Sequence, residues 1–131
     1  MPRLAMCLLP VVLLALAGCG DDKGTAPTIA DLTYNPTTMP VGQATTITGN
    51  FTFTDPDGDL KDMVASVTLP SGQTQTLPAQ ALQNEAGQTN GAATLLLMLN
   101  PPAAGTYRFE VWLTDDAGNA SNHLGGTLEA Q

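Results

Sequence analysis

The chain has 131 residues, with 4 lysines and arginines against 12 aspartates and glutamates, and a formal net charge of −8 at pH 7. This balance excludes an electrostatic nucleic-acid interface, which needs clustered Lys and Arg, so we expect no nucleic-acid partner. The length allows one domain rather than two once an N-terminal segment is set aside.

Residues 1–18 have the organisation of a secretory signal. Arg3 supplies a positive charge, residues 4–17 form an apolar run, and small residues lead to Cys19. The run is shorter than the roughly 20 apolar residues that a membrane-spanning helix needs. We therefore expect residues 1–18 to be removed from the mature protein.

The motif Leu16-Ala17-Gly18-Cys19 resembles the lipobox of bacterial lipoproteins. The resemblance implies that the thiol of Cys19 carries a lipid such as palmitate and that Cys19 becomes the new N-terminus at the cell envelope. Stable anchoring needs more than one acyl chain. Because Gly20 rather than Asp follows the cysteine, the resemblance favours the outer membrane over the inner membrane.

The chain beyond the lipobox predicts a short tether and an all-β domain. Residues 19–27 are polar and contain glycine, as expected of a flexible tether. Residues 28–131 alternate apolar with polar positions between recurrent turn signals, which is typical of a β-sandwich. We expect seven strands, at residues 28–34, 41–54, 61–69, 73–77, 92–99, 105–114 and 120–129.

The alternation within these strands also predicts the core, because successive side chains of a strand point to opposite faces. The side chains expected to face inward are Ile47, Phe51, Phe53, Met63, Ala65, Val67, Leu69, Tyr107, Phe109, Val111 and Leu113. In the last strand, the consecutive glycines Gly125 and Gly126 predict a bulge or bend.

Three segments carry a resemblance to bacterial immunoglobulin-like domains. Residues 104–111 (AGTYRFEV) resemble their penultimate strand, residues 115–121 (DDAGNAS) the turn that follows it, and residues 54–60 (TDPDGDL) the acidic loop of cadherin-like repeats. The resemblance covers residues 28–131 and implies a sandwich in which the hydroxyl of Tyr107 binds backbone at a corner. It implies an architecture rather than a function, since this fold hosts many unrelated roles.

Acidic residues gather in two predicted loops that a sandwich would bring to the same end. Calcium takes six to eight oxygen ligands, several of them carboxylates. We therefore predict a calcium site formed by Asp55, Asp57, Asp59, Asp115, Asp116 and Asn119.

The alternative is that these residues serve only as turn formers, because Asp, Asn, Pro and Gly favour turns without any metal. The first loop is also not an EF-hand. Counting from Asp55, Leu60 stands where that motif needs glycine, and Ser66 where it needs glutamate. The sequence leaves both interpretations open.

Catalytic residues are scarce, and we expect no enzyme activity. His123 is the only histidine, and we interpret it as a surface or strand residue. Ser66, Ser71 and Ser121 lack the Gly-x-Ser-x-Gly context of a nucleophile elbow. Paired carboxylates exist in the loops, but a small sandwich with short loops offers little cleft.

Two apolar features are candidates for a partner surface. Trp112 falls on the outward face of its strand, where it could bind a protein or glycan, or be covered by a neighbour. In residues 92–99 both faces are apolar, so Leu96 and Met98 are expected to be exposed, docked on a partner or covered by residues 77–83. Self-association or a larger assembly would account for them.

These observations together predict a lipid-anchored binding or structural module of the bacterial cell envelope, with acidic loops that calcium stabilises. The alternative prediction is a subunit of a larger envelope or extracellular assembly, which docks through the strand face of Leu96 and Met98.

Overall fold

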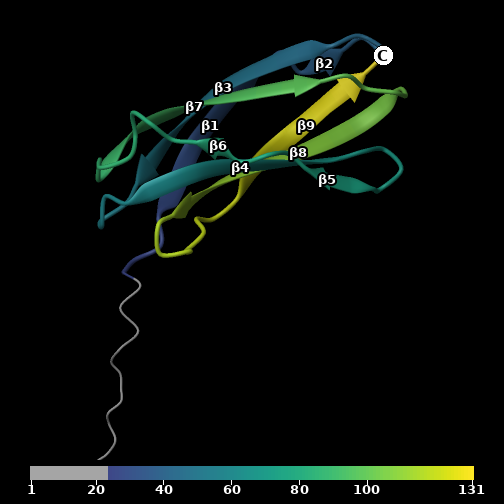
Figure 1. Ribbon diagram of the computed structural model, residues 1–131. Coiled ribbons are helices and arrows are strands. Elements are labelled where there is room, and N and C mark those ends of the chain that lie inside the picture. The colour runs from purple at the N-terminus through teal and green to yellow at the C-terminus, as the bar shows by residue number, and fades with distance from the viewer. Residues whose placement is uncertain (1–23) are drawn as a thin grey trace, which may run out of the picture.

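The computed structural model describes residues 24–131, and these form two β-sheets packed face to face without a helix (Figure 1). The predicted signal peptide at residues 1–18, the predicted lipidation site Cys19 and the first part of the predicted tether lie outside the described residues. The all-β sandwich architecture expected for residues 28–131 is confirmed.

One sheet has three strands in the order β1-β3-β7, and the other has six, in the order β2-β9-β8-β4-β5 with β6 also paired to β4. All pairings are antiparallel except that of β2 with β9. The strands are β1 Thr28–Asn35, β2 Thr38–Met39, β3 Thr45–Thr54, β4 Leu60–Thr68, β5 Thr74–Thr76, β6 Gln80–Ala81, β7 Asn90–Leu99, β8 Gly105–Asp115 and β9 Leu124–Ala130.

The seven predicted strands are all present, but residues 24–131 contain nine, so the predicted count is wrong. The two additional strands, β2 and β6, have two residues each. Thr38 and Met39 are strand only because they lie beside Glu129 and Ala130 of β9. Two residues are too few for a detectable alternation, so such strands are defined by their tertiary partner.

The core lies between the two sheets, and within residues 24–131 it is supplied by residues 29–130. Every residue expected to face inward is buried there except Leu69, which is partly buried and packs against the others. The buried apolar side chains are Ile29, Met39, Ile47, Phe51, Phe53, Leu60, Met63, Ala65, Val67, Ala93, Leu95, Leu97, Tyr107, Phe109, Val111, Leu113, Leu128 and Ala130.

The expected tyrosine corner is present at the start of β8. The hydroxyl of Tyr107 donates to the carbonyl oxygen of Ala103 at 2.8 Å and accepts from the N–H of the same residue at 3.3 Å. The ring is buried while the hydroxyl satisfies backbone groups of the preceding loop, which fixes the entry into β8.

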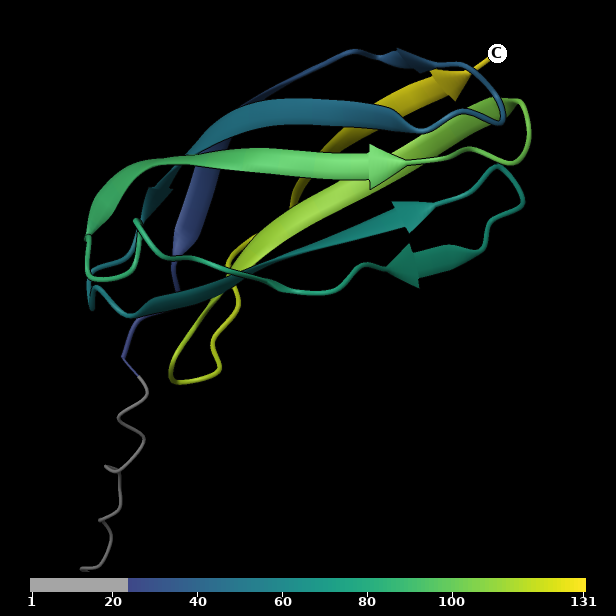
Figure 2. The same cartoon turned by 45° about the horizontal axis from the view of Figure 1, so that its top comes forward.

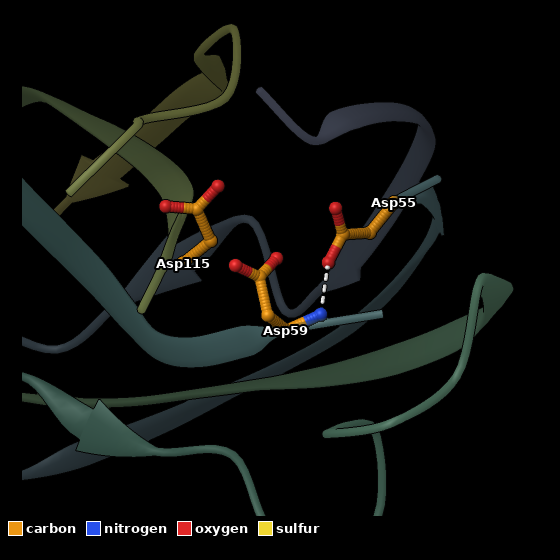
Figure 3. A group of neighbouring side chains, drawn as sticks. All are labelled: Asp55, Asp59 and Asp115. Carbon is orange, nitrogen blue, oxygen red and sulfur yellow. Dashed lines mark hydrogen bonds between the residues drawn. The ribbon is translucent and has the colours of Figure 1, made fainter. Parts of the chain in front are cut away.

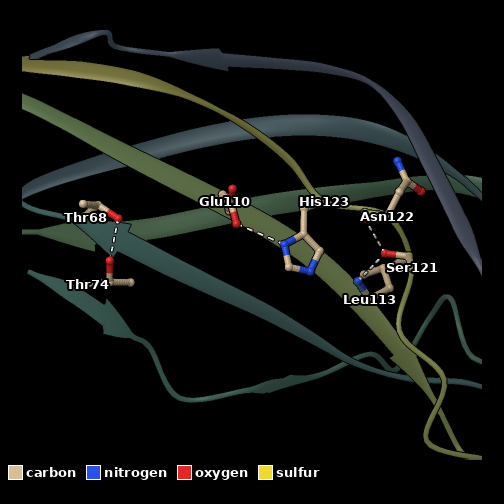
Figure 4. A network of polar contacts seen from close by, with 7 residues as sticks. All are labelled: Thr68, Thr74, Glu110, Leu113, Ser121, Asn122 and His123. Carbon is tan, nitrogen blue, oxygen red and sulfur yellow. Dashed lines mark hydrogen bonds and ion pairs between the residues drawn. The ribbon is translucent and has the colours of Figure 1, made fainter. Parts of the chain in front are cut away.

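The last strand starts later than predicted because side chains replace the sheet ladder before it. Ser121 accepts a hydrogen bond from the N–H of Leu113 at 2.9 Å and donates to the carbonyl of Asn122 at 2.8 Å (Figure 4). The Asn122 amide bonds both backbone groups of Ile29 in β1, at 2.8 and 2.9 Å. These contacts connect the two sheets, and regular pairing resumes at Leu124.

Of the bulge or bend predicted at the paired glycines, the bulge is wrong, because Gly125 and Gly126 continue the β8–β9 register without a shift. Glycine is needed there for space. A Cβ on Gly126 would lie 2.3 Å from the hydroxyl oxygen of Tyr34. That hydroxyl donates to the carbonyl of Thr127 and accepts from its N–H, at 3.0 and 3.1 Å, so the Tyr34 side chain lies over the strand.

We expect Gly126→Ala to lower the free energy of unfolding by about 1–3 kcal/mol, the usual cost of overpacking a well-packed site. Urea denaturation measures this change. In a Tyr34→Ala background the obstructing ring is absent, so the same substitution should cost clearly less. An equal cost in both backgrounds would contradict the steric explanation.

Candidate metal site

The two acidic loops meet at one end of the sandwich, as the sequence predicted from the topology. Asp55 directly follows β3, Asp59 directly precedes β4, and Asp115 is the last residue of β8. In the β4–β8 ladder, Leu60 lies opposite Asp115. One carboxylate oxygen from each of the three aspartates lies within 4.8 Å of the others, and Figure 3 shows the three side chains turned toward one another.

Asp55 is completely buried, with 0 % of its surface exposed. Its Oδ2 accepts a hydrogen bond from the backbone N–H of Asp59 at 2.8 Å, and its carbonyl accepts one from Gly58 at 3.0 Å. Gly58 takes a positive φ of 65°, which closes this tight turn. The second carboxylate oxygen, Oδ1, is buried without a hydrogen-bond partner.

Asp59 is partly buried, and its Oδ1 is also buried without a hydrogen-bond partner. Burial raises the pKa of this carboxyl above its usual range, and the nearby charges of Asp115 and Asp55 raise it further. The backbone carbonyl of Asp59 accepts from the N–H of Asp116 at 2.9 Å, which joins the two loops. The electrostatic environment of Asp59 is therefore strongly negative.

Asp115 is 2 % exposed, and its carboxylate accepts hydrogen bonds from its own loop. Its Oδ1 accepts from the N–H groups of Ala117 and Asn119, at 3.1 and 2.7 Å, and its Oδ2 accepts from the side-chain amide of Asn119 at 3.1 Å. Asn119, which we predicted as a ligand, thus orients the carboxylate of Asp115.

Two other predicted ligands lie outside this group of three. Asp57 and Asp116 are exposed, although they are neighbours in sequence of the three clustered aspartates. Oδ2 of Asp57 accepts a hydrogen bond from the backbone N–H of Thr25 at 2.6 Å, so this carboxylate holds the N-terminal segment against the loop. No pattern in the sequence indicated this contact.

The three clustered carboxylates have the chemistry of a site for a hard divalent cation. An isolated buried carboxylate is costly, and two of these carboxylates each have a buried oxygen that no described group satisfies. Ca²⁺ and Mg²⁺ both prefer oxygen ligands, and Ca²⁺ accepts irregular arrangements that include backbone carbonyls. The residues present therefore fit calcium, with Asp55, Asp59 and Asp115 as the side chains that would hold it.

The predicted partner residues lie elsewhere on the sandwich. Trp112 is half-buried because the ring of His123 stacks on it, with centroids 4.2 Å apart and planes 9° from parallel. Nδ1 of His123 lies 3.0 Å from a carboxylate oxygen of Glu110, and both side chains are exposed (Figure 4). Leu96 and Met98 are 46 % and 68 % exposed, so residues 77–83 do not cover them.

No protein-family model matches the sequence, and the search of curated proteins finds no match. Among solved structures, the chain is similar to the PKD domain of an M14-like peptidase from a Thermoplasmatales archaeon. The TM-score is 0.51, the identity is 20 %, and the match covers 82 % of this chain and 97 % of that one. A Niemann-Pick type C2 protein from the Japanese carpenter ant also matches with a TM-score of 0.51, at 9 % identity over 82 % of this chain and 95 % of that one.

The strand order, the tyrosine corner and these similarities define the described part of the chain as an immunoglobulin-like β-sandwich. At such low identity the similarities concern the fold and not the function. Within residues 24–131, no helix is long and apolar enough to cross a membrane.

Without divalent cations, we expect Asp59→Asn to raise the midpoint of thermal unfolding. It removes one charge from a group of mutually repelling carboxylates, and burial together with this repulsion raises the pKa of Asp59. Asp116→Asn removes the same charge from the neighbouring loop but at an exposed position, so its midpoint should stay close to that of the wild type. Scanning calorimetry in excess chelator measures both, and a lower midpoint for Asp59→Asn would contradict the repulsion.

Proposed function

We propose that this protein is a lipid-anchored binding or structural module of the bacterial cell envelope, whose acidic end is stabilised by calcium. The immunoglobulin-like sandwich is its rigid scaffold, Cys19 carries the anchor, and Asp55, Asp59 and Asp115 hold the ion. Its role is binding or scaffolding rather than catalysis, with a protein or glycan as the ligand.

The observation that carries the calcium assignment is the pair of unpartnered oxygens, Oδ1 of Asp55 and Oδ1 of Asp59. Turn chemistry explains why aspartates occur in these loops, and it accounts for the hydrogen bonds of Asp115. It does not account for carboxylate oxygens that are buried without a donor, since turn-forming aspartates normally use theirs as acceptors. A bound cation would satisfy both oxygens and neutralise the repulsion.

The N-terminus supports an arrangement in which the acidic end faces the membrane. The chain enters β1 at the end of the sandwich that carries the acidic loops, whereas the C-terminus lies at the opposite end (Figure 1). Thr25 is bonded to Asp57, and Pro27 is buried. Four residues separate Cys19 from Gly24, so a lipid on Cys19 would hold the acidic end within about 18 Å of the anchor.

A second candidate function is that of a subunit in a larger envelope or extracellular assembly. The observation that favours it is the exposure of Leu96 and Met98 on adjacent outward positions of one strand. Exposed apolar side chains that occur singly need no explanation, but neighbouring ones on a regular surface suggest a docking site.

We expect calcium to raise the midpoint of thermal unfolding of a protein that spans residues 20–131. This segment contains every buried apolar residue named above. At about 100 times the dissociation constant, a ligand that binds only the native state contributes about 2.7 kcal/mol, a rise of about 10 °C for a domain of this size. Asp55→Asn should abolish the rise, and Asp57→Asn, at an exposed position outside the group, should keep it. An unchanged wild-type midpoint at millimolar calcium would refute the site.

The lipid anchor is tested separately, with the full chain expressed in a bacterial host. We expect the wild type to enter the detergent phase on Triton X-114 partitioning, and its intact mass to exceed that of residues 19–131 by the mass of the acyl groups. Cys19→Ser removes the thiol that would be lipidated and should leave the protein in the aqueous phase. Equal partitioning of the two proteins, or an unmodified wild-type mass, would contradict lipidation.

A further inference from the structure

Strand β7 is an edge of the three-stranded sheet, and within residues 24–131 it pairs only with β3 (Figure 2). The N–H of Asp55 donates to the carbonyl of Thr89 at 2.7 Å and extends the register in which Thr54 lies opposite Asn90. Bonded and non-bonded pairs alternate along an antiparallel ladder. The even-numbered residues of β7 therefore turn their N–H and C=O groups away from β3.

A second hydrogen bond supports this orientation. The carbonyl of Leu96 accepts from the side-chain amide of Gln80 at 3.4 Å, and Gln80 belongs to β6 of the other sheet. The carbonyl of Leu96 therefore points to the free edge of β7. The same even-numbered positions carry the exposed side chains, including Thr94, Leu96 and Met98.

The side chain of Gln80 reaches this edge at the carbonyl of Leu96, but β7 itself has none of the sequence features that protect an edge strand against pairing with another chain. Natural edge strands are short, carry lysine or another charge, contain proline, or bulge. β7 has ten residues, its sequence NGAATLLLML contains neither charge nor proline, and its register with β3 is regular throughout. β3 is also free of charged residues. This margin is therefore uncharged over two adjacent strands, in a chain with a net charge of −8.

A crevice of about 280 Å³ with a mixed polar and apolar lining lies beside the same edge. Met98 and Leu99 border it from β7, and Val67 of β4 borders it from the other sheet, with Leu69 and Leu77 from the connections next to that sheet. Apart from the carbonyl of Leu96, which Gln80 bonds, the edge thus offers backbone groups that β3 does not use, together with the exposed side chains of Leu96 and Met98.

We propose that β7 pairs antiparallel with β7 of a second copy of this chain, so that the two three-stranded sheets become one continuous sheet. Copies of so acidic a protein repel one another over most surfaces, and like charges at an interface oppose association. The uncharged β3–β7 margin avoids that cost. Pairing centred near Leu97 places Leu96 of each copy opposite Met98 of the other, so the contact is self-complementary, as a two-fold interface requires.

The partner is β7 of a second copy rather than a strand of a different protein, because the pairing is self-complementary. Two exposed apolar side chains then lie beside the equivalent pair on the outer face. The edge N–H and C=O groups find matching groups in the copy, where the backbone N–H of the partner replaces Gln80 at the carbonyl of Leu96. The proposal does not depend on calcium or on the lipid anchor. It specifies which surface forms the assembly considered above.

Sedimentation velocity over a range of protein concentrations, in chelator and again in calcium, tests the proposal with residues 20–131. We expect a monomer–dimer equilibrium for the wild type. Leu96→Pro removes an edge N–H that β3 does not use, a change that edge strands tolerate, and Leu96→Lys adds an edge charge in case the proline variant does not fold. Each should raise the dimer dissociation constant by at least about tenfold.

Thr48→Lys is the matched control, because Thr48 lies directly opposite Leu96 on β3 and is exposed on the same outer face. Edge pairing leaves that face in solvent, so the control should dimerise nearly as the wild type does. Thermal melts of each variant confirm folding. A wild type that stays monomeric at millimolar concentration would overturn the proposal. So would a dimer that survives both substitutions at Leu96, or one that Thr48→Lys disrupts equally.

Discussion

The register between β4 and β8 is the constraint on which both the core and the acidic site depend. It sets Met63 opposite Leu113 in the core and, after a register shift between Leu60 and Asp62, Leu60 opposite Asp115 at the end of the ladder. A slip of one residue in the core would exchange the two faces of a strand and expose Met63. The burial of apolar side chains in the middle of the sandwich, together with this shift, thus sets the spacing of charged side chains at its end.

At the acidic end, some buried polar atoms of the described residues have no hydrogen-bond partner. Asp115 is compensated by hydrogen bonds from its own loop, whereas Asp55 and Asp59 keep buried oxygens without donors. Buried unpaired carboxylates oppose folding, and native proteins keep such local conflicts mainly at functional sites. The well-packed sheets and the hydrogen bond from the N–H of Asp116 to the carbonyl of Asp59 hold these loops together despite the repulsion.

Different surfaces of the sandwich have different chemistry. The N-terminal segment and the three clustered carboxylates share one end, while the uncharged edge of β7 and the crevice beside it lie along the side. A lipid anchor and a cation at the acidic end would leave the edge of β7 free to contact another chain. Trp112 belongs to neither surface. It lies in β8, and the ring of His123 stacks on it.

Local patterning was enough to predict the β-sandwich and its inward-facing residues, and the resemblance to immunoglobulin-like domains implied the tyrosine corner. Alternation has a period of two within a single strand, and Tyr107 forms its corner with a residue four positions away, so neither depends on distant parts of the chain. Contacts between distant residues decided the rest. β2 is a strand because of β9, and Gly126 is glycine because Tyr34 lies over it. Asp55 and Asp115 continue the inward alternation of β3 and β8, so their burial follows the pattern of those strands. Only the packing of the two loops brings Asp59 beside them and leaves Asp57 and Asp116 exposed, because side-chain direction in a turn depends on what the turn packs against.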